Sequence, residues 1–362
     1  MSKRKISISD IARKAGVSHT TVSRALRDSP LISSKVREEI KQLAREMKYV
    51  PNGIAQSLLS SRTNTIGVVV TSIADPFFAE VVEGIEQIAR SAGLSVLLSA
   101  SHRDLEQEIA AIDNLHRRRV DGMLVADSRM NKHHTKQRVQ IAVPTVFINA
   151  QAEDQPEMFH SVAIDDYLGA RLAVEHLVNL GHTCIGYLGV GDKRSLLPKA
   201  DRSKSNQQRL EGYRMALSEA GLPQMTDWIA INDEDNVRSS DVATGQKMLS
   251  KLVTTGVTSI FCYNDMVAVG ALLASRELGI SVPQDLSLVG FDGIALSGYV
   301  TPPLTTVSQP MLEIGRSAMQ MLLDLLEEKT VEKRVLSPFL VKRGSSAAFK
   351  NNPPSHFQVI SG

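Results

Sequence analysis

The 362-residue chain has only two cysteines and no long apolar segment. Cys184 and Cys262 lie in separate apolar runs that resemble strands, so we expect buried free thiols and neither a disulfide nor a metal site. No apolar run reaches the ~20 residues that a membrane-spanning helix needs. The basic start of the chain lacks the apolar stretch and cleavage site of a secretion signal, so the sequence predicts a cytoplasmic protein.

Motifs of common enzyme classes are also missing. The sequence has no Walker loop, no G-x-S-x-G elbow and no H-E-x-x-H pair. Gly189-Val190-Gly191 is a lone G-x-G without a third glycine, which is too weak a signal for a dinucleotide site. His176 and His182 have a poor spacing for a zinc pair, and we expect the histidines to be structural or solvated. The sequence therefore predicts neither an enzyme nor a bound cofactor or metal.

The net charge of +2 hides a strong asymmetry along the chain. Residues 1–62 carry 13 Lys and Arg against 5 Asp and Glu, whereas the other 300 residues carry 28 against 34. A small basic segment joined to a larger acidic one is typical of a nucleic-acid-binding module fused to another domain. A merely solvated, lysine-rich cap would have the same charge, so composition alone leaves both readings open.

The order of residues in positions 1–49 favours a DNA-binding head. Ser7-Ile8-Ser9-Asp10 fits a capping box that starts a first helix, and Gly16 can adopt the left-handed conformation that ends it. Ser18 suits the N-cap of a second helix and Ser33 that of a third, which has the apolar stripe Val36, Ile40, Leu43 and Met47. Two short helices around a glycine turn form the helix-turn-helix pattern.

The second helix is expected to present polar side chains where a recognition helix meets base edges: His19, Thr20, Ser23 and Arg24. Arginine can bind guanine through two hydrogen bonds, whereas serine and threonine mostly reach phosphates or either base. Any one of these residues would more often be plain surface. The ordered set therefore carries the prediction, and no single member does.

Residues 9–24, SDIARKAGVSHTTVSR, resemble the signature of the LacI/GalR family of bacterial transcription regulators, and residues 49–58, YVPNGIAQSL, resemble its hinge. The resemblance continues to Leu340-Val341-Lys342-Arg343 and covers nearly the whole chain. It implies a sequence-specific regulator that binds operator DNA as a homodimer and responds to a small-molecule effector. We expect this regulator to be a repressor. By resemblance, the operator contacts are Ser9, Ser18, His19, Thr20, Ser23 and Arg24, with Asn52, Ala55 and Gln56 close to the backbone or minor groove.

Residues 50–62 are expected to form a hinge helix and linker. Asn52 to Leu59 offers only about two helical turns, and a helix shorter than ~12 residues is marginal alone in water. Leu58 is either a linker residue resting on the following domain or, as the resemblance implies, a wedge inserted into the minor groove.

From Thr65 onward, short apolar strands alternate with longer helices that end repeatedly in glycine, which is the βαβ rhythm of parallel sheets. Strands are predicted at Ile66–Val70, Leu94–Ser99, Met123–Ala126, Thr145–Ile148, Ser161–Ile164, Ile185–Gly189, Ser259–Tyr263 and Leu286–Gly290. Residues 63–349 should form two doubly wound lobes, and the resemblance implies a periplasmic-binding-protein-like sensor. The first lobe is expected to hold about 63–164 and 295–329, and the second about 165–294 and 330–349. The chain would cross near Asp165, Ala295 and Thr330, and 350–362 would be a disordered tail.

Ligands of doubly wound sheets bind at the carboxyl ends of the strands. Polar residues follow the predicted strands at Asp75, Asp127, Asn149, Asn264-Asp265 and Asp292. By resemblance, Arg209 and Asp292 clamp the effector, Asn149 and Asn264 add polar contacts, and Phe77, Phe78 and Trp228 supply apolar wall. One of Phe77 and Phe78 can instead be core, and Asp265 can simply cap a helix. An arginine, a carboxylate and aromatic faces suit a sugar or nucleoside.

Two alternatives stay open at this point. Loop 190–208 is longer than is usual in the family and rich in Lys, Arg, Ser and Asn, so it is either solvated surface or a contact to an anionic effector. A free-standing solute-binding protein would fit the two lobes alone, but the 62-residue head and the missing signal peptide count against it. No heptad follows Arg343, so we expect a dimer without a tetramer-forming helix.

Gly53 gives a direct test of the hinge prediction. Gly53→Ala should tighten operator binding by up to ~1 kcal/mol, because alanine makes the short helix easier to form. Leu58→Ala should weaken binding by removing the wedge. Hydrogen exchange of residues 50–60 measures the folding step, and strong protection that is the same without and with operator DNA would contradict a hinge that folds on binding.

Overall fold

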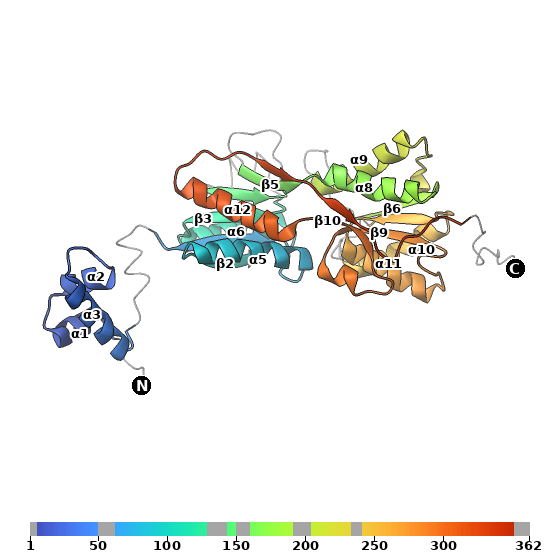
Figure 1. Cartoon of the computed structure of the whole chain (residues 1–362). Helices are drawn as coiled ribbons and strands as arrows, with labels where there is room; N and C mark the ends of the chain where they lie inside the picture. The colour runs from blue at the N-terminus through green and yellow to red at the C-terminus, as the bar shows by residue number, and fades with distance from the viewer. Residues whose placement is uncertain are drawn as a thin grey trace. The chain divides into compact units, whose positions relative to one another are not determined.

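The computed structural model describes residues 6–49, 62–128, 143–149, 160–190, 204–232 and 241–350. The chain divides into two compact units, Met1–Thr63 and Asn64–Gly362, which we call the head and the body and describe separately (Figure 1). The hinge residues Asn52, Gly53, Ala55, Gln56 and Leu58, most of loop 190–208 and the tail after residue 350 lie outside the described ranges. Among the described helices, none has the length and apolar character of a membrane-crossing segment.

The head contains three helices, α1 (Ile8–Ala15), α2 (His19–Leu26) and α3 (Ser34–Glu46), as predicted. The Ser7 hydroxyl and the Asp10 carboxylate form the expected capping box at the start of α1. Gly16 ends α1 with a φ of 65°, a left-handed conformation that glycine adopts at little cost. The side chains of Ser18 and Ser33 cap α2 and α3.

A small apolar core holds the three helices of the head together. Ile11 from α1, Val22 and Ala25 from α2, and Ile40 from α3 are almost completely buried. The other members of the predicted α3 stripe, Val36, Leu43 and Met47, are partly buried against this cluster. The polar face of α2 is thereby left on the surface of the head.

The body is built on two six-stranded sheets, which agrees with the predicted α/β class. The first lobe has the strand order β11-β5-β4-β3-β1-β2, and all of its pairs are parallel. Its strands are β1 (Thr65–Val70), β2 (Ser95–Ala100), β3 (Gly122–Ala126), β4 (Thr145–Ile148), β5 (His160–Ile164) and β11 (Arg334–Leu336). Helices α5 (Pro76–Ser91) and α12 (Met311–Leu326) share a core with Ile66 and Val68, whereas α6 (Leu105–Arg117) shares one with Val69. Alternate residues of β1 thus serve the two faces of the sheet.

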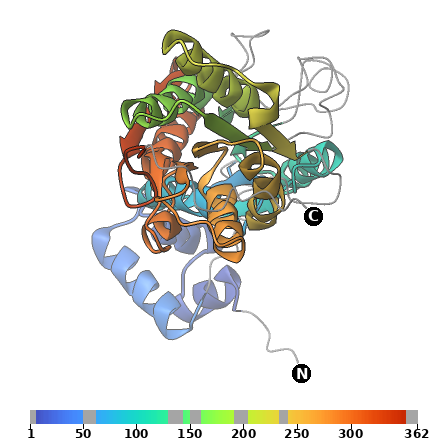
Figure 2. The same ribbon diagram turned by 90° about the vertical axis from the view of Figure 1, so that its right-hand side faces the viewer.

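The second lobe repeats this topology with the strand order β12-β10-β9-β8-β6-β7. Its strands are β6 (Ile185–Val190), β7 (Ile229–Asn232), β8 (Ser259–Cys262), β9 (Ser287–Asp292), β10 (Thr305–Ser308) and β12 (Phe339–Val341), of which only β12 pairs antiparallel. Helices α8 (Asp166–Asn179) and α9 (Lys204–Glu219) cover one face, and α10 (Val242–Val253) and α11 (Asp265–Glu277) cover the other (Figure 2). Short turns of 3-10 helix lie at Thr226–Trp228 and Ala295–Gly298.

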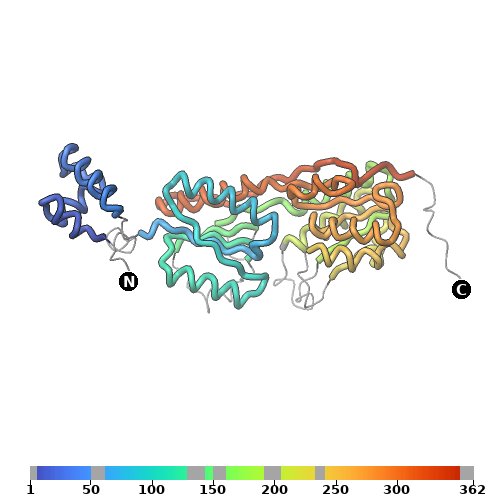
Figure 3. Tube along the Cα trace, turned by 90° about the horizontal axis from the view of Figure 1, so that it is seen from below, coloured from blue at the N-terminus to red at the C-terminus, as the bar shows by residue number. Residues whose placement is uncertain are grey.

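The chain passes three times between the lobes, and two of the crossings lie later than predicted. The first is at Asp165, as expected, where the chain leaves β5 and enters α8. The second falls at Gln309-Pro310, because β10 still pairs with β9 of the second lobe and α12 is the next element that packs in the first lobe. The third lies between β11 and β12, because β11 still pairs with β5. The orange and red end of the chain therefore runs along both lobes (Figure 3).

These differences have a simple physical cause. Strand β10 has the sequence Thr-Thr-Val-Ser, and β11 and β12 have three residues each, so none shows the apolar run of a central strand. Their positions depend on pairing with strands far away in the sequence. Both cysteines are free; Cys262 is buried in the core of the second lobe, as predicted, whereas Cys184 is only partly buried.

Glycine pairs let helices approach closely on one side of each sheet. In the first lobe, a Cβ atom on Gly84 of α5 would overlap the carbonyl oxygen of Leu312, and one on Gly315 of α12 would overlap that of Val81. Gly245 and Gly270 are related in the same way where α10 meets α11. Any side chain at these positions must push the two helices apart.

Gly315→Ala should therefore destabilise the body by about 1–3 kcal/mol or more, because the added methyl group meets rigid backbone. Chemical denaturation of the full-length protein measures the loss. Gly298→Ala is the matched control, since its added Cβ would have no neighbour nearer than 3.9 Å. Equal stability of the two variants would contradict the close helix contact.

Candidate DNA-binding surface and interlobe cleft

Helix α2 of the head presents a polar surface of the predicted composition. Ser18, His19, Thr20 and Arg24 are exposed, and so is Ser9 on α1. The Ser18 hydroxyl accepts a hydrogen bond from the backbone N–H of Thr21 at 3.0 Å, which fixes the start of α2. The first turn of α2 is thus rigidly held while the next two side chains remain free to meet a ligand.

Ser23 differs from the sequence expectation. The Arg27 guanidinium donates to the Ser23 hydroxyl at 2.7 Å and to the Ser23 carbonyl oxygen at 3.1 Å, and the Ser23 side chain is half-buried. Arg27 itself is exposed at the end of α2. The spacing of four residues between Ser23 and Arg27 could have indicated this contact from the sequence, because residues four apart are neighbours on a helix surface.

The body contains a cleft between its two lobes. The lining residues come from the carboxyl ends of β1 to β4 in the first lobe, from the second lobe and from the second crossing: Asp75, Phe77, Phe78, Arg103, Asp127, Asn149, Ser205, Arg209, Tyr263, Asn264, Asp292 and Gln309. The cleft encloses about 370 Å³, part of it open to solvent.

All six residues that the sequence predicted for the effector site lie in this one cleft: Phe77, Phe78, Asn149, Arg209, Asn264 and Asp292. Phe77 and Phe78 pack edge-to-face with ring centroids 5.0 Å apart, and both also belong to the core of the first lobe. Both interpretations of this aromatic pair therefore apply. Trp228 lies instead in the core of the second lobe, so its predicted place in the cleft wall is wrong.

Arg209 has the most heavily paired side chain of the cleft. Its Nε donates to Asp166 Oδ1 at 2.7 Å, its Nη1 donates to the Tyr263 carbonyl oxygen at 2.6 Å, and Asp292 Oδ1 lies 3.7 Å away. The guanidinium carbon also lies 3.7 Å from the ring centroid of Phe291. Burial alone would lower the pKa of Arg209, but the nearby Asp166, Tyr263 and Asp292 hold it above its ordinary value.

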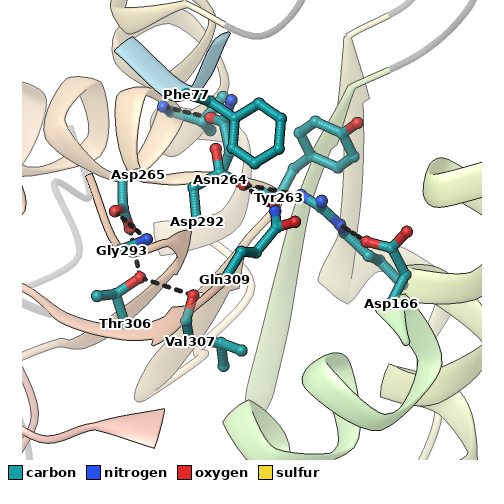
Figure 4. Close-up of polar contacts among 12 residues, drawn as sticks. Phe77, Asp166, Tyr263, Asn264, Asp265, Asp292, Gly293, Thr306, Val307 and Gln309 are labelled. Atoms are coloured by element: carbon teal, nitrogen blue, oxygen red, sulfur yellow. Dashed lines mark hydrogen bonds and ion pairs between the residues drawn. The ribbon is translucent and has the colours of Figure 1, made fainter. Parts of the chain in front are cut away.

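Asp292 combines burial with an unusual backbone conformation. Its φ is 111°, and its Oδ1 accepts a hydrogen bond from Gln309 Nε2 at 2.7 Å (Figure 4). Burial raises the pKa of this carboxyl well above its usual range, and Arg209 only partly opposes that effect. Asp127 and Asn149 also have positive φ values, of 49° and 56°, where β3 and β4 end. Strained residues thus gather at the strand ends that line the cleft.

Two polar atoms of the cleft residues are buried without a partner in the described part of the chain. They are Oε1 of Gln309 and Oδ1 of Asn149, both hydrogen-bond acceptors. An unmet buried acceptor costs about 1–3 kcal/mol, so a ligand that donates to these atoms gains that energy on binding.

The sequence left open that Asp265 caps helix α11, but the structure shows that it does not. Asn264 is the N-cap, and its Oδ1 accepts from the Val267 N–H at 2.9 Å. The Asp265 carboxylate instead accepts from the backbone N–H groups of Gly293 and Ile294 and from the Thr306 hydroxyl, at 2.8, 2.9 and 2.5 Å. Burial raises the pKa of Asp265 to about 7 although these bonds oppose the shift. Asp265 thus anchors the turn that follows Asp292 (Figure 4).

Arg103, Tyr263 and Gln309 line the cleft and were missed by the sequence analysis. Arg103 follows strand β2 and lies 3.7 Å from Asp75, and the polar run after that strand could have indicated it. Tyr263 directly follows β8 and was taken as part of the strand. Gln309 follows β10, a strand that the sequence did not reveal.

The two spaced histidines have structural partners. His176 Nε2 lies 2.9 Å from the Ser346 hydroxyl, and burial lowers the pKa of His176 to about 4. The ring of His182 contacts the hydroxyls of Thr258 and Ser287 at 2.9 and 3.1 Å. No group of three potential metal ligands occurs among the described residues.

Comparison with known proteins gives the same picture along the whole chain. The sequence model of the lacI family of bacterial regulatory proteins matches residues 7–52, and that of a periplasmic binding protein-like domain matches residues 174–346. The chain is 35% identical to the HTH-type transcriptional repressor CytR of Escherichia coli over 94% of its own length and 96% of that protein.

Two solved structures show the likeness in three dimensions. The lac repressor dimer bound to operator and the anti-inducer ONPF superimposes with a TM-score of 0.81 at 29% identity, covering 95% of this chain and all of that one. A LacI family regulator from Enterococcus faecium with bound ribose gives 0.67 at 28% identity, covering 79% of this chain and all of that one.

Arg24 is the exposed α2 residue best able to read a base. Arg24→Ala should weaken binding to an operator selected from random DNA by about 1–3 kcal/mol more than binding to random duplex, because base contacts carry specificity. Titrations with both duplexes measure the difference. Arg45→Ala, which removes an exposed arginine from the end of α3, is the control. Equal losses on both duplexes would assign Arg24 to phosphate alone.

Proposed function

The chain belongs to the LacI family of bacterial regulatory proteins, and from this premise we propose which of its residues bind DNA and effector. As a member of this family it is a DNA-binding transcription regulator with an effector-binding domain, and it is not an enzyme. We propose that it acts as a repressor in the cytoplasm, where the chromosome is, and that two copies read a two-fold operator.

On the DNA side, the proposed contacts are the exposed residues of α2 and its start: Ser18, His19, Thr20 and Arg24, with Ser9 on α1. Ser23 is the least accessible of the predicted set, so its contact depends on its remaining O–H donor. The hinge residues Asn52, Ala55, Gln56 and Leu58 are proposed from the sequence resemblance alone, as contacts to the minor groove.

On the effector side, the best support comes from the buried Arg209–Asp292 pair beside the unpaired acceptor of Gln309. Such a group offers one strong donor and several acceptors at one point, which suits vicinal hydroxyls or an amide edge. Phe77, Phe78 and Tyr263 add apolar faces for a ring. We propose an effector of the size of a sugar or a nucleoside, with Asn149 and Asn264 as further polar contacts.

The charges of the described cleft wall favour an uncharged effector. Asp75, Asp127 and Asp292 line the cleft against only Arg103 and Arg209, and Asp166 already meets the charge of Arg209. A phosphate or carboxylate group would therefore have to compete with carboxylates that already lie beside both arginines, Asp75 beside Arg103 and Asp166 beside Arg209. The alternative of an anionic effector rests on loop residues 191–203, which lie outside the described ranges.

The position of Gln309 suggests how the cleft controls the rest of the chain. Gln309 is the last residue before the chain crosses from β10 to α12, and its amide N–H bonds Asp292. An effector that competes for Asp292 changes the contacts at this crossing and so biases the angle between the lobes. A coupling of about 1–3 kcal/mol is enough for a strong regulatory switch.

A thermal-shift screen of neutral sugars and nucleosides against the full-length protein tests the site. A ligand at 100 times its dissociation constant should stabilise the protein by ~2.7 kcal/mol. Arg209→Ala and Asp292→Asn should abolish the shift, whereas Asp227→Asn, on the exposed surface of the second lobe, should keep it. A full shift in both cleft variants would place the effector elsewhere, and a response to sugar phosphates alone would exclude the neutral class.

Effector affinity should also depend on pH through Asp292. Because burial raises the pKa of the free carboxyl and ligand hydroxyls stabilise its charged form, binding should release a proton. Affinity should then rise with pH above the ordinary carboxyl range and level off once the raised pKa is passed. Calorimetry of the wild type in buffers of different ionisation enthalpy detects the proton. Proton uptake in the wild type would contradict a ligand that donates to Asp292.

A further inference from the structure

Three consecutive arginines lie at the end of helix α6. Arg117 is the last residue of the helix, Arg118 and Arg119 follow it, and all three side chains are exposed. They stand out in the body, where acidic residues outnumber basic ones. Because α6 connects the parallel strands β2 and β3, its end lies at the amino ends of the strands, away from the cleft.

This edge of the first lobe is also where the chain enters the body. The Asn64 N–H donates to Asp121 Oδ2 at 2.7 Å, and the Asp121 N–H donates to the Thr65 carbonyl oxygen at 2.8 Å. Only Val120 separates the three arginines from Asp121, which binds the first residue of the body. Only the fourteen residues 50–63 separate Asn64 from Tyr49 at the end of the three-helix segment, and even fully extended they span at most ~50 Å.

Arg117 and Arg118 are not neutralised within the described part of the chain. Arg117 Nε donates to the Asp113 carbonyl oxygen and Arg118 Nε to Asn114 Oδ1, each at 3.3 Å, and no carboxylate forms an ion pair with either. By contrast, Arg90 and Arg171 on other helices of the body pair with glutamates of their own helix. The guanidinium NH₂ groups of Arg117 and Arg118 therefore keep donors for an external anion.

Two acidic groups of the same edge are engaged elsewhere. Asp121 binds the backbone of Asn64, and Glu327, after α12 on the other face of the sheet, pairs with Lys329 at 2.7 Å. A basic end of a helix has an ordinary explanation, because positive charge stabilises the carboxyl end of a helix by about 0.3–1 kcal/mol. That explanation accounts for one arginine in the last turn and leaves the second of the pair Arg117 and Arg118 unexplained.

We propose that Arg117 and Arg118 contact phosphates of the DNA to which the head is bound, so that the body adds a sequence-independent contribution to affinity. The short linker limits how far the patch can lie from the head, and DNA carries about one phosphate per 1.7 Å of its axis. Two or more exposed guanidinium groups at one point suit phosphate oxygens. Arg119 extends the same positive surface.

The salt dependence of DNA binding by the full-length protein tests this proposal. Each phosphate contact contributes about −0.9 to the slope of log K against log salt, so one substitution in a dimer should reduce the magnitude of the slope by about 2. Arg117→Ala and Arg118→Ala should show this change on a selected operator and on random duplex alike. Arg118→Lys should restore most of the slope, because it keeps the charge.

Arg214→Ala, which removes an exposed arginine of α9 in the second lobe, is the control and should leave the slope unchanged. A purely helix-stabilising role would lower the thermal unfolding midpoint and leave the slope at the wild-type value, and this result would overturn the proposal. A uniform loss of affinity at every salt concentration would also overturn it, since it indicates an action through the linker or the partner subunit. A shallow slope in the wild type would instead count against DNA binding by the head.

Discussion

A guanidinium group removed from water must find partners for its charge and its N–H donors inside the protein. Arg209 of α9 finds them in α8, in the backbone after β8 and in β9, through Asp166, Tyr263, Phe291 and Asp292. Loss of one partner from such a buried pair typically costs about 3–5 kcal/mol. The mutual positions of these elements, and hence the wall of the cleft, follow from the need to keep this group satisfied.

The same constraint leads from the cleft to the boundary between the lobes. Asp292 has a strained backbone conformation, Arg209 and Gln309 both lie beside its carboxylate, and Asp265 holds the turn after it. Gln309 is in turn the last residue before the chain passes into the first lobe. A ligand cannot replace one of these contacts without affecting the next, so binding chemistry and lobe geometry are linked by three side chains.

The sequence predicted best what depends on neighbouring residues. Ser7, Gly16 and Ser33 act within one helical turn, so the limits of the head helices could be predicted from the sequence. The apolar strands of the body could be predicted from their runs of apolar residues. Strands β10 and β11 could not be found, because they exist only through pairing with β9 and β5. Because β10 was not predicted, the position of Gln309 in the cleft could not be predicted either.

Candidate site residues were predictable for a similar reason. Polar residues that follow apolar strands lie at one edge of a parallel sheet, which brought Asn149 and Asp292 to the same cleft. Trp228 was misplaced because a single aromatic residue in a short segment carries no periodicity, and the structure uses it as core. Whether Asp265 caps a helix or anchors a turn depends on Gly293 and Thr306, which are distant in sequence.

The three crossings mean that neither lobe is a continuous piece of chain, and this determines the order in which the protein can fold during synthesis. The first lobe lacks α12 until residue 326 has left the ribosome and the edge strand β11 until residue 336 has done so, and the glycine face of α5 stays uncovered until α12 has emerged. The second lobe is incomplete until β12 has been synthesised, which ends five residues after β11. The head can complete its core after fewer than fifty residues. A nascent chain therefore carries a finished head ahead of an unfinished body, and a ribosome that stalls before α12 leaves α5 exposed to chaperones and proteases.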